Sequence, residues 1–232
     1  MTGLSGPDIV IAARNVTLTL GTAAAPVAIL KGIDLDVRRG ESVAILGPSG
    51  SGKSSLMAIL SGLERASGGS VEIAGVPFGS LDEDALARAR RGRIGIVLQS
   101  FHLLPTMTAL ENVAVPLELA GAGDAFARAE AELTSVGLGH RLDHYPTQLS
   151  GGEQQRVAIA RAVAPGPDLI FADEPTGNLD AGTSGAIVDL LFAREQAADA
   201  TLVIITHDPG LAERCGRVLR MRDGLIVEDS GA

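Results

Sequence analysis

The sequence predicts an α/β fold, with a parallel sheet as its core and a helical insertion within that sheet. Short, mostly apolar runs, typical of strands buried on both faces, occur at 42–46, 94–98, 168–172 and 201–206. A glycine-rich loop follows the first of these runs and precedes a helical pattern. Between residues 100 and 165 the strand signal nearly vanishes and helical patterns replace it, so this segment is expected to interrupt the sheet.

The first forty residues predict strands. Asp8–Leu20 is rich in β-forming residues, and Ile29–Val37 partly alternates apolar and polar residues, as a half-buried strand does. The segment between them, Gly21–Pro26, is expected to be a loop of small residues. Further β segments are expected at 70–73, 217–221 and 225–227, the last two joined by a hairpin turn at Asp223-Gly224.

Helical patterns fill much of the remaining chain. Ser150 is expected to begin one helix, because Glu153 follows at the spacing of a capping box. Gly121 and Gly123 separate two other helices. The other expected helices lie at 53–63, 81–91, 109–120, 124–136 and 183–197.

Composition and charge exclude several classes of protein. The 232 residues carry a net charge of −9, and the arginines are scattered singly or in pairs, so no nucleic-acid partner is expected. Cys215 is the only cysteine, which excludes an internal disulfide and fits a reducing cytosol. The first residues lack the layout of a secretory signal, and no apolar run approaches the ~18–20 residues that span a bilayer. Any membrane role is therefore expected to depend on a partner protein.

A phosphate-binding motif follows the predicted strand at 42–46. Gly47–Ser54 (GPSGSGKS) matches G-x-x-x-x-G-K-[ST] and lies between a buried strand and a helix, as the motif requires. Glycines let backbone N–H groups curve around phosphate oxygens, and the helix N-terminus adds positive potential. Lys53 is expected to bind the β and γ phosphates, and the Ser54 hydroxyl to ligate Mg²⁺. The residues predicted here to bind nucleotide are Gly47, Pro48, Ser49, Gly50, Ser51, Gly52, Lys53, Ser54 and Ser55.

Two acidic residues follow the apolar run at 168–172. Asp173 ends that run, and its carboxylate is expected to lie beside the Mg²⁺ of the phosphate loop, as in a Walker B motif. Glu174 comes next and is expected to polarise the attacking water as the general base. The plain alternative is a strand that ends in two solvated acids.

The segment Leu149–Glu153 (LSGGE) distinguishes among the classes of protein that contain a phosphate loop. Ser150, Gly151 and Gly152 stand at a predicted helix start, where backbone N–H groups form a second anion site. On these residues the sequence resembles the ABC ATPases, in which this signature loop faces the γ-phosphate bound by the opposite subunit. Residues 150–153, Glu153 included, are therefore expected to bind nucleotide across a two-fold homodimer that forms with ATP. The plain alternative is a simple capped helix.

Three single residues match further motifs of that family. Gln99 follows the run 94–98 and resembles the Q-loop glutamine, which links Mg²⁺ and the attacking water to the helical subdomain. His207 follows TLVIIT and resembles the H-loop histidine, which contacts the γ-phosphate. Asp180, in GNLD, resembles the D-loop aspartate, which communicates across the dimer and can also cap the next helix. The resemblance implies that the catalytic residues are Glu174, His207, Lys53 and Gln99. It also implies that the metal ligands are Ser54, Gln99 and Asp173.

The resemblance covers about residues 9–228 and extends to the fold. It implies a RecA-like P-loop NTPase core with a parallel sheet, an N-terminal antiparallel β subdomain and an inserted α-helical subdomain. The chain, 1–232, is then a single ABC ATPase domain, with a nucleotide-binding core at 1–98 and 166–232 and a helical subdomain carrying the signature motif at 99–165. The segments QSFHLLPTMTALENVAVPLEL, LSGGEQQRVAIARA and FADEPTGNLD look most like the lipoprotein-releasing and macrolide-exporter ATPases, and YbbA-type ATPases among them.

A function and partners follow from this resemblance. The chain is expected to hydrolyse Mg-ATP and to power a separate membrane permease, through which it lies on the cytoplasmic face of the inner membrane. The implied substrate is a lipid, a lipoprotein or a hydrophobic compound. The permease is expected to contact Gln99–Leu119, where apolar side chains cluster near Pro105; alternatively, these side chains fill the core of the helical subdomain. They are Phe101, Leu103, Leu104 and Met107.

One position departs from the family pattern. ABC ATPases usually place an aromatic residue upstream of the phosphate loop to stack on adenine, whereas the aligned residue here is Leu20 and no aromatic residue precedes Phe78. Stacking on a base contributes about 1–3 kcal/mol. Weak discrimination between ATP and GTP is therefore expected, with triphosphate and Mg²⁺ contacts supplying most of the affinity.

Other P-loop proteins fit the chain less well. A DNA-repair ABC ATPase needs a long coiled coil, for which the about 65 residues between Gln99 and Pro165 leave no room. A translation-associated ABC protein normally carries two such domains, and a P-loop kinase needs a lid but not LSGGE. A non-enzymatic adaptor does not need the intact catalytic set. The alternative that stays open is the ATPase of an importer or of a cell-division ABC complex.

Overall fold

The computed structural model describes residues 9–22, 25–198 and 200–231, and the chain divides into two compact units. Unit 1 comprises residues 1–90 and 201–232, and unit 2 comprises residues 91–200. Unit 2 thus contains the segment 99–165 together with strands and a helix that flank it. The assignment of 99–165 as a separate helical subdomain stays a prediction.

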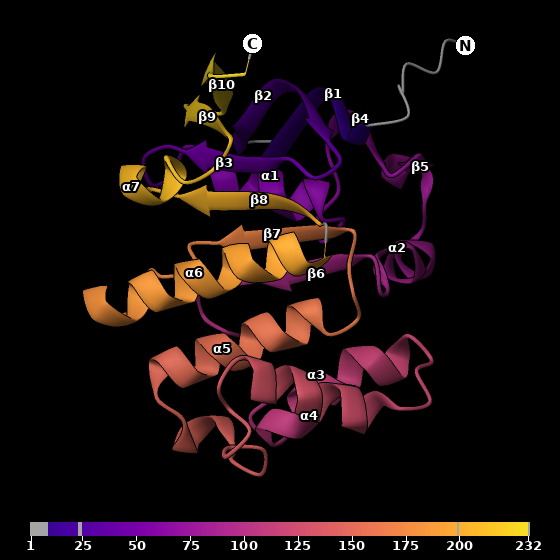
Figure 1. The fold of residues 1–232 in the computed structure, drawn as a ribbon. Coiled ribbons are helices and arrows are strands. Elements are labelled where there is room, and N and C mark those ends of the chain that lie inside the picture. The colour runs from indigo at the N-terminus through magenta and orange to yellow at the C-terminus, as the bar shows by residue number, and fades with distance from the viewer. Residues whose placement is uncertain (1–8, 23–24, 199, 232) are drawn as a thin grey trace. The chain divides into compact units, whose positions relative to one another are not determined.

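Unit 1 contains an antiparallel sheet that includes the N-terminal strands. Its order is β2-β1-β4-β5, and every neighbouring pair is antiparallel (Figure 1), which confirms the predicted antiparallel β subdomain. The strands are β1 (Ile9–Thr22), β2 (Ala25–Arg38), β4 (Gly68–Ile73) and β5 (Val76–Pro77).

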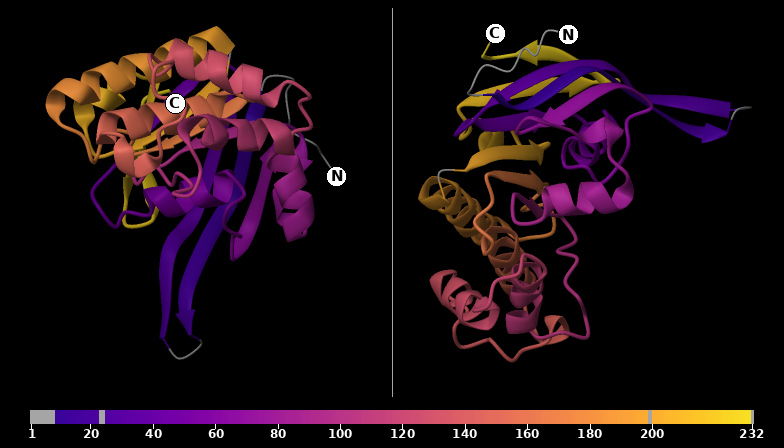
Figure 2. Two further views of the ribbon diagram at one scale, coloured as in Figure 1. Left: turned by 90° about the horizontal axis from the view of Figure 1, so that it is seen from below. Right: turned by 90° about the vertical axis from the view of Figure 1, so that its right-hand side faces the viewer.

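The hairpin of β1 and β2 is longer than the sequence predicted. Figure 2 shows it extending beyond the other strands of unit 1. The expected loop was wrong at residues 21–22 and 25–26, because Gly21 pairs with Pro26 and Thr22 with Ala25; residues 23 and 24 of that prediction lie outside the described residues. Small side chains do not obstruct this register, and Gly21 adopts a φ of 97° that favours glycine. Asp8, the first residue of the predicted strand, lies outside the described residues.

A second group of strands in unit 1 leads to the phosphate loop. β3 (Ser42–Leu46) pairs in parallel with both β8 (Thr201–Thr206) and β9 (Arg217–Arg222), while β10 (Leu225–Asp229) pairs antiparallel with β9. Every residue of β8 is buried, in agreement with its apolar sequence. The helices of unit 1 are α1 (Lys53–Leu60), η1 (Phe78–Ser80), α2 (Glu83–Arg90) and α7 (Pro209–Ala212).

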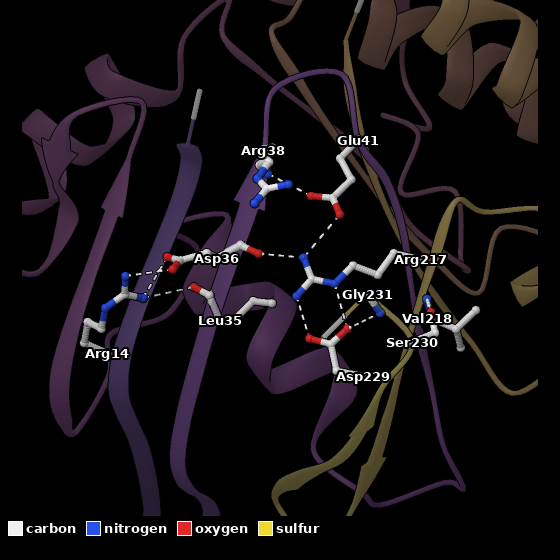
Figure 3. Close-up of polar contacts among 10 residues, drawn as sticks. All are labelled: Arg14, Leu35, Asp36, Arg38, Glu41, Arg217, Val218, Asp229, Ser230 and Gly231. Carbon is white, nitrogen blue, oxygen red and sulfur yellow. Dashed lines mark hydrogen bonds and ion pairs between the residues drawn. The ribbon is translucent and has the colours of Figure 1, made fainter. Parts of the chain in front are cut away.

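An ion-pair network joins the C-terminal hairpin of unit 1 to its N-terminal strands (Figure 3). Arg217 on β9 donates through Nε and Nη2 to both carboxylate oxygens of Asp229, at 2.8 and 2.6 Å. Its Nη1 donates to Glu41 Oε1 at 3.2 Å and to the Asp36 carbonyl at 2.9 Å. The Arg217 guanidinium holds the pKa of Asp229 below its usual value, so this carboxylate is ionised in the folded state.

Unit 2 combines two parallel strands with a group of helices. β6 (Ile94–Val97) pairs in parallel with β7 (Leu169–Asp173). The helices are α3 (Ala109–Leu119), α4 (Ala125–Ser135), η2 (Pro146–Gln148), α5 (Gly151–Val163) and α6 (Ala181–Ala198). In Figure 1, α5 is the central helix of this unit, since it contacts α3, α4, α6 and β6.

The core of unit 2 forms around α5. Val113, Leu117, Leu133 and Val157, from three helices, are fully buried in one apolar cluster. Strand β6 approaches α5 closely because residue 95 is glycine: a Cβ there would lie 2.5 Å from the carbonyl oxygen of Ala162. Among the described residues, none of the helices combines the length and the apolar character needed to cross a membrane.

Candidate nucleotide site

The predicted phosphate loop of unit 1 lies between β3 and α1. Gly52, at the N-cap of α1, has a φ of 98° and provides no side-chain oxygen to the first turn of the helix. The N–H groups of that turn therefore have no side-chain cap at Gly52, which suits a helix start that binds an anion. Lys53 is buried, and its Nζ donates to the carbonyl oxygens of Gly47 and Pro48, each at 2.9 Å. The lysine charge is thus held over the loop itself.

Three glycines give this loop the shape of a phosphate cradle. A Cβ at Gly47 would lie 2.3 Å from the Met221 carbonyl oxygen, so only glycine fits there. A Cβ at Gly52 would lie 2.9 Å from Leu30 Cδ2, and Gly50 adopts a φ of 79° over open space. Exposed backbone at these positions suits close approach of phosphate oxygens.

His207 lies at the same sheet edge as the phosphate loop. Leu46 of β3 and Thr206 of β8 are parallel partners, and Gly47 and His207 each come directly after them. Parallel strands carry their C-terminal ends at one edge, where ligands of α/β sheets bind. The Asp208 N–H donates to Thr206 Oγ1 at 3.0 Å, which fixes the turn that exposes His207. Unit 1 therefore brings the predicted triphosphate contacts together.

The proposed base of unit 2 occupies an unusual backbone conformation. Asp173 ends β7, and Glu174 follows with a φ of 45°. The left-handed region costs a residue with a side chain about 1–2 kcal/mol, so tertiary contacts must hold it. The Glu174 carbonyl accepts a hydrogen bond from the Gly177 N–H at 2.9 Å. Gln155, which is fully buried on α5, donates through Nε2 to the Pro175 carbonyl at 2.7 Å.

Gln99 lies near the residues that follow Glu174. Val97 of β6 and Ala172 of β7 are parallel partners, and Gln99 and Glu174 each stand two residues beyond them. Asn178 Nδ2 donates to the Gln99 carbonyl at 2.9 Å, and Gln99 Nε2 donates to Asn178 Oδ1 at 3.4 Å. A Cβ at Gly177 would lie 2.8 Å from Gln99 Nε2, so glycine makes room for this pair. Sequence reasoning missed Asn178, because nothing in GNLD indicates a partner 79 residues away.

The turn that follows Gln99 is also held by a side chain of α5. Phe101 and His102 have φ angles of 58° and 47°. Arg161 donates through Nη2 to the Phe101 carbonyl at 2.8 Å and through Nη1 to the His102 carbonyl at 2.6 Å. Burial lowers the pKa of the Arg161 guanidinium. Gln155 and Arg161 lie within LSGGEQQRVAIARA, but the sequence does not indicate their partners, because these are backbone carbonyls from other segments.

The signature segment begins α5 with the predicted capping box. The Glu153 N–H donates to Ser150 Oγ at 3.3 Å, and the Ser150 N–H donates to Glu153 Oε2 at 2.8 Å. The backbone hydrogen bond from Ser150 and the ion pair with Arg141 lower the pKa of Glu153. Gly152 needs its lack of a side chain, because a Cβ would lie 2.5 Å from Thr183 Cγ2. These contacts place the start of α5 against the start of α6.

Asp180 acts as the N-cap of α6. Its Oδ1 accepts from the Thr183 N–H at 3.0 Å, and its Oδ2 accepts from Thr183 Oγ1 at 2.7 Å. These hydrogen bonds lower the pKa of Asp180. The capping role expected for this residue is therefore confirmed, and its role across a dimer stays a prediction.

The segment predicted to contact a permease has one buried and one exposed face. Leu103 packs against the apolar core of unit 2, whereas Leu104 is 43% exposed. The buried Asn112 side chain accepts from the Leu104 N–H at 2.7 Å and donates to the carbonyls of Leu104, Met107 and Thr108. Leu103 therefore fills the core of unit 2, whereas the permease contact stays a prediction that the exposed Leu104 leaves open.

The donor chemistry of the predicted metal ligands fits Mg²⁺. Ser54, Gln99 and Asp173 provide a hydroxyl, an amide oxygen and a carboxylate, and oxygen donors of this kind are those that Mg²⁺ prefers. Mg²⁺ at nucleotide sites usually takes only one or two protein ligands and completes its shell with phosphate and water oxygens. Ser54 lies in unit 1, and the other two residues lie in unit 2.

Comparison with known proteins shows the family to which this chain belongs. Residues 30–177 match the family model described as ABC transporter. The chain is 48% identical over 223 residues to the uncharacterised ABC transporter ATP-binding protein YbbA of Escherichia coli strain K12, covering 95% of this chain and 98% of that protein. It is 51% identical over 221 residues to the lipoprotein-releasing system ATP-binding protein LolD 2 of Caulobacter vibrioides, covering 94% and 96%.

A longer relative and a solved structure extend the comparison. The macrolide export ATP-binding/permease protein MacB of Marinobacter nauticus is 50% identical over 228 residues, which cover 97% of this chain and 35% of that protein. The dimeric post-hydrolysis state of the ATP-binding cassette MJ0796, bound to ADP and Pi, matches with a TM-score of 0.89 at 39% identity, covering 95% of this chain and 97% of that one. The same fold and the same motifs recur along nearly the whole chain. It therefore belongs to the ABC transporter family, as one of its ATP-hydrolysing cassettes.

Proposed function

We propose that two copies of this chain close around two molecules of Mg-ATP and that hydrolysis powers a separate membrane permease. The work done is the extraction or export of a lipid, a lipoprotein or a hydrophobic compound. The relatives named for lipoprotein release and macrolide export support this substrate class. The chain itself acts at the cytoplasmic face of the membrane through its permease.

One observation carries the proposal: two helices in different units begin at glycine-rich segments that suit anion binding. The first is α1, with its glycine cradle and Lys53, and the second is α5, which begins after Ser150. Each provides backbone N–H groups and the positive end of a helix dipole. In a head-to-tail pair, a nucleotide on the phosphate loop of one copy meets residues 150–153 of the other. The dimeric cassette MJ0796 supports this arrangement.

The hydrolysis step follows from the chemistry of the site residues. Glu174 accepts a proton from the attacking water, whose oxygen forms a bond to the γ-phosphorus as the bond to the bridging oxygen of ADP breaks. Lys53 and His207 stabilise the charge on the transferring phosphoryl group, and Gln99 orients the water. Ser54, Asp173 and Gln99 would hold Mg²⁺, which would neutralise phosphate charge when bound. ATP binding favours the closed pair by mass action, and loss of the γ-phosphate reopens it.

Substitution of the proposed base tests this mechanism. Glu174→Gln keeps the size of the side chain and removes its basicity, so we expect hydrolysis to fall by at least ~100-fold while ATP still binds. The variant should form a stable dimer with Mg-ATP, measured by size-exclusion chromatography with light scattering, and a monomer without it. Glu130→Gln, on an exposed position of α4, is the matched control. Rapid steady hydrolysis by Glu174→Gln, or ATP binding without dimerisation, would contradict the mechanism.

The permease contact is tested best at Leu104. Glu111 is less suitable, because its Oε2 accepts from the Thr108 N–H at 2.7 Å and a charge reversal there would break the capping box of α3. Leu104→Asp changes an exposed side chain and leaves the backbone contacts of Asn112 in place. We expect an integral membrane protein to copurify with the wild-type chain from native membranes and to be lost with this variant.

The copurified protein also decides between the proposed function and its alternative. A permease with few membrane spans and a large extracytoplasmic domain fits mechanical extraction or export. A permease with many spans and a substrate-binding protein, or a division protein, would identify an importer or a cell-division complex.

A further inference from the structure

The two turns that follow the proposed catalytic residues of unit 2 share one feature. Glu174 has a φ of 45°, and after Gln99 the residues Phe101 and His102 have φ angles of 58° and 47°. Residues with side chains keep such angles only where surrounding contacts hold them. In both turns, side chains of the same helix, α5, provide some of these contacts.

Two side chains of α5 bind three carbonyl groups in these turns. Gln155 is 0% exposed and donates to the Pro175 carbonyl at 2.7 Å, directly after Glu174. Arg161 donates to the Phe101 and His102 carbonyls at 2.8 and 2.6 Å, a short distance after Gln99. Since six residues separate Gln155 from Arg161, one rigid helix fixes both turns.

The first turn of α5 contacts the same loops. A Cβ at Gly151 would lie 3.4 Å from Leu179 Cδ2 and 3.9 Å from the Phe101 ring. An α-helix rises 1.5 Å per residue, so Arg161, ten positions after Gly151, lies about 15 Å further along the axis. A displacement at the signature end of this helix is therefore carried to both catalytic turns.

We propose that Gln155 and Arg161 are positioning residues for ATP hydrolysis. They hold the turns beside Glu174 and Gln99 in register with the start of α5. When residues 150–153 bind nucleotide, the side chains of Glu174 and Gln99 are therefore aligned together. This inference rests on the proposed function, which assigns Gln99 and Glu174 their roles. Neither Gln155 nor Arg161 contacts the nucleotide in this account. The fork of an arginine is required, because a single ammonium group does not reproduce its planar pair of donors.

Steady-state kinetics of three variants test the proposal. Gln155→Met and Arg161→Met remove the donors and keep much of the side-chain volume, while Arg161→Lys keeps the charge. We expect kcat to fall by roughly 10- to 100-fold in each, since small misplacements of catalytic groups have effects of that size. KM for Mg-ATP should change by less than about twofold, because the phosphate cradle belongs to unit 1.

Arg128→Met is the matched control. Arg128 on α4 donates through Nη2 to the Ala164 carbonyl at 2.9 Å, so this variant also loses an arginine–carbonyl contact in unit 2. That contact lies just beyond the C-terminal end of α5 and touches neither catalytic turn. We expect its kcat to stay within about twofold of the wild type, with a loss of thermal stability similar to that of Arg161→Met.

Hydrogen exchange reports the positions of the turns directly. The Phe101 N–H donates to the Leu98 carbonyl, and the Gly177 N–H donates to the Glu174 carbonyl. Exchange should accelerate around residue 101 in the Arg161 variants and around residue 177 in Gln155→Met, but at neither place in Arg128→Met. If Arg161→Met does not fold, Arg161→Lys and Gln155→Met provide the same readouts.

Three outcomes would overturn the proposal. The first is a kcat of Arg161→Met equal to that of Arg128→Met, and the second is a wild-type kcat of Arg161→Lys. The third is an equal rate of hydrogen exchange at residues 101 and 177 in all variants. Glu174→Gln is measured beside them, so that a failure of the proposed function can be told from a failure of the positioning role. Rapid hydrolysis by Glu174→Gln would remove the proposed base itself. An inactive Glu174→Gln beside a fully active Arg161→Met would remove only the positioning role.

Discussion

The phosphate loop of unit 1 and the catalytic turns of unit 2 hold their residues by different means. In unit 1, Lys53 donates to carbonyls five and six residues earlier, and the strand and helix that flank the loop are contiguous with it. In unit 2, Gln99 is bound by Asn178, and Arg161 holds the turn after Gln99 from about 60 residues away. One region is organised by a continuous sequence motif, and the other by tertiary contacts.

This difference separates binding from turnover. The glycines of the unit 1 loop give its backbone much of its shape, and the more distant residues that touch the loop, Leu30, Met221 and Gly224, also belong to unit 1. Turns that depend on side chains of α5 change whenever that helix is displaced. We therefore expect substitutions in the unit 1 loop to change nucleotide affinity, and substitutions in the contacts of unit 2 to change kcat.

Lys53→Ala should give the largest effect in unit 1. It removes the charge nearest to the expected β and γ phosphates, and a hydrogen bond to a charged group contributes about 1.5–3 kcal/mol, or roughly 10- to 100-fold in affinity. Nucleotide affinity, measured with a fluorescent ATP analogue, should fall by about that factor. Lys31→Ala is the matched control, because Lys31 is the only other lysine and is exposed on β2. If Lys53→Ala bound the ATP analogue with near-normal affinity, the assignment of nucleotide affinity to the unit 1 loop would be wrong.

Leu20→Tyr should sharpen the comparison of the two units, because it should raise the affinity for ATP without changing kcat. Leu20 is 47% exposed near the end of β1, opposite its strand partner Val27. An aromatic ring at the expected adenine position adds about 1–3 kcal/mol of stacking, so ATP affinity should rise roughly tenfold and preference for ATP over GTP should increase. Leu225→Tyr, on an exposed position of β10, is the control. A wild-type chain that already strongly prefers ATP would contradict the expectation.

Asp229→Asn should have the smallest effect, confined to the stability of unit 1. The folded-state pKa of Asp229 is lowered by Arg217, so its ionised form stabilises the fold above the unfolded pKa, near 3.9. That contribution is lost as the pH falls through the lower folded pKa. At neutral pH the variant should lose roughly 1–2 kcal/mol of unfolding free energy. Between about pH 5 and pH 2 its stability should fall less steeply than that of the wild type.

Urea unfolding at several pH values measures this difference. Asp223→Asn is a suitable control, because Asp223 is 83% exposed and lies in the turn between β9 and β10. Nucleotide affinity and kcat at neutral pH should be unchanged in both variants. Equal acid sensitivity of Asp229→Asn and the wild type would show that the Arg217 network contributes little.

The strands and the motif-bearing helices could be predicted because their signals are local. The apolar runs at 42–46 and 201–206 became buried strands with the same bounds, and the spacing of Ser150 and Glu153 gave the capping box that is observed. The loop predicted at residues 21–22 and 25–26 was wrong because strand pairing, which depends on the opposite strand, overrode the weak local preference of small residues. The helix expected to reach Leu63 ends at Leu60, since Gly62 adopts a φ of 70°.

The sequence by itself determined the family, the phosphate loop and the identity of the residues proposed to bind and hydrolyse ATP, because each of these is written in a short contiguous motif. Only the tertiary structure decided how unit 2 holds its part of the site. The partners of Gln155 and Arg161 are backbone carbonyls, which every residue possesses, so no side-chain pattern in the sequence indicates them. Their selection depends on which turns the fold brings to α5.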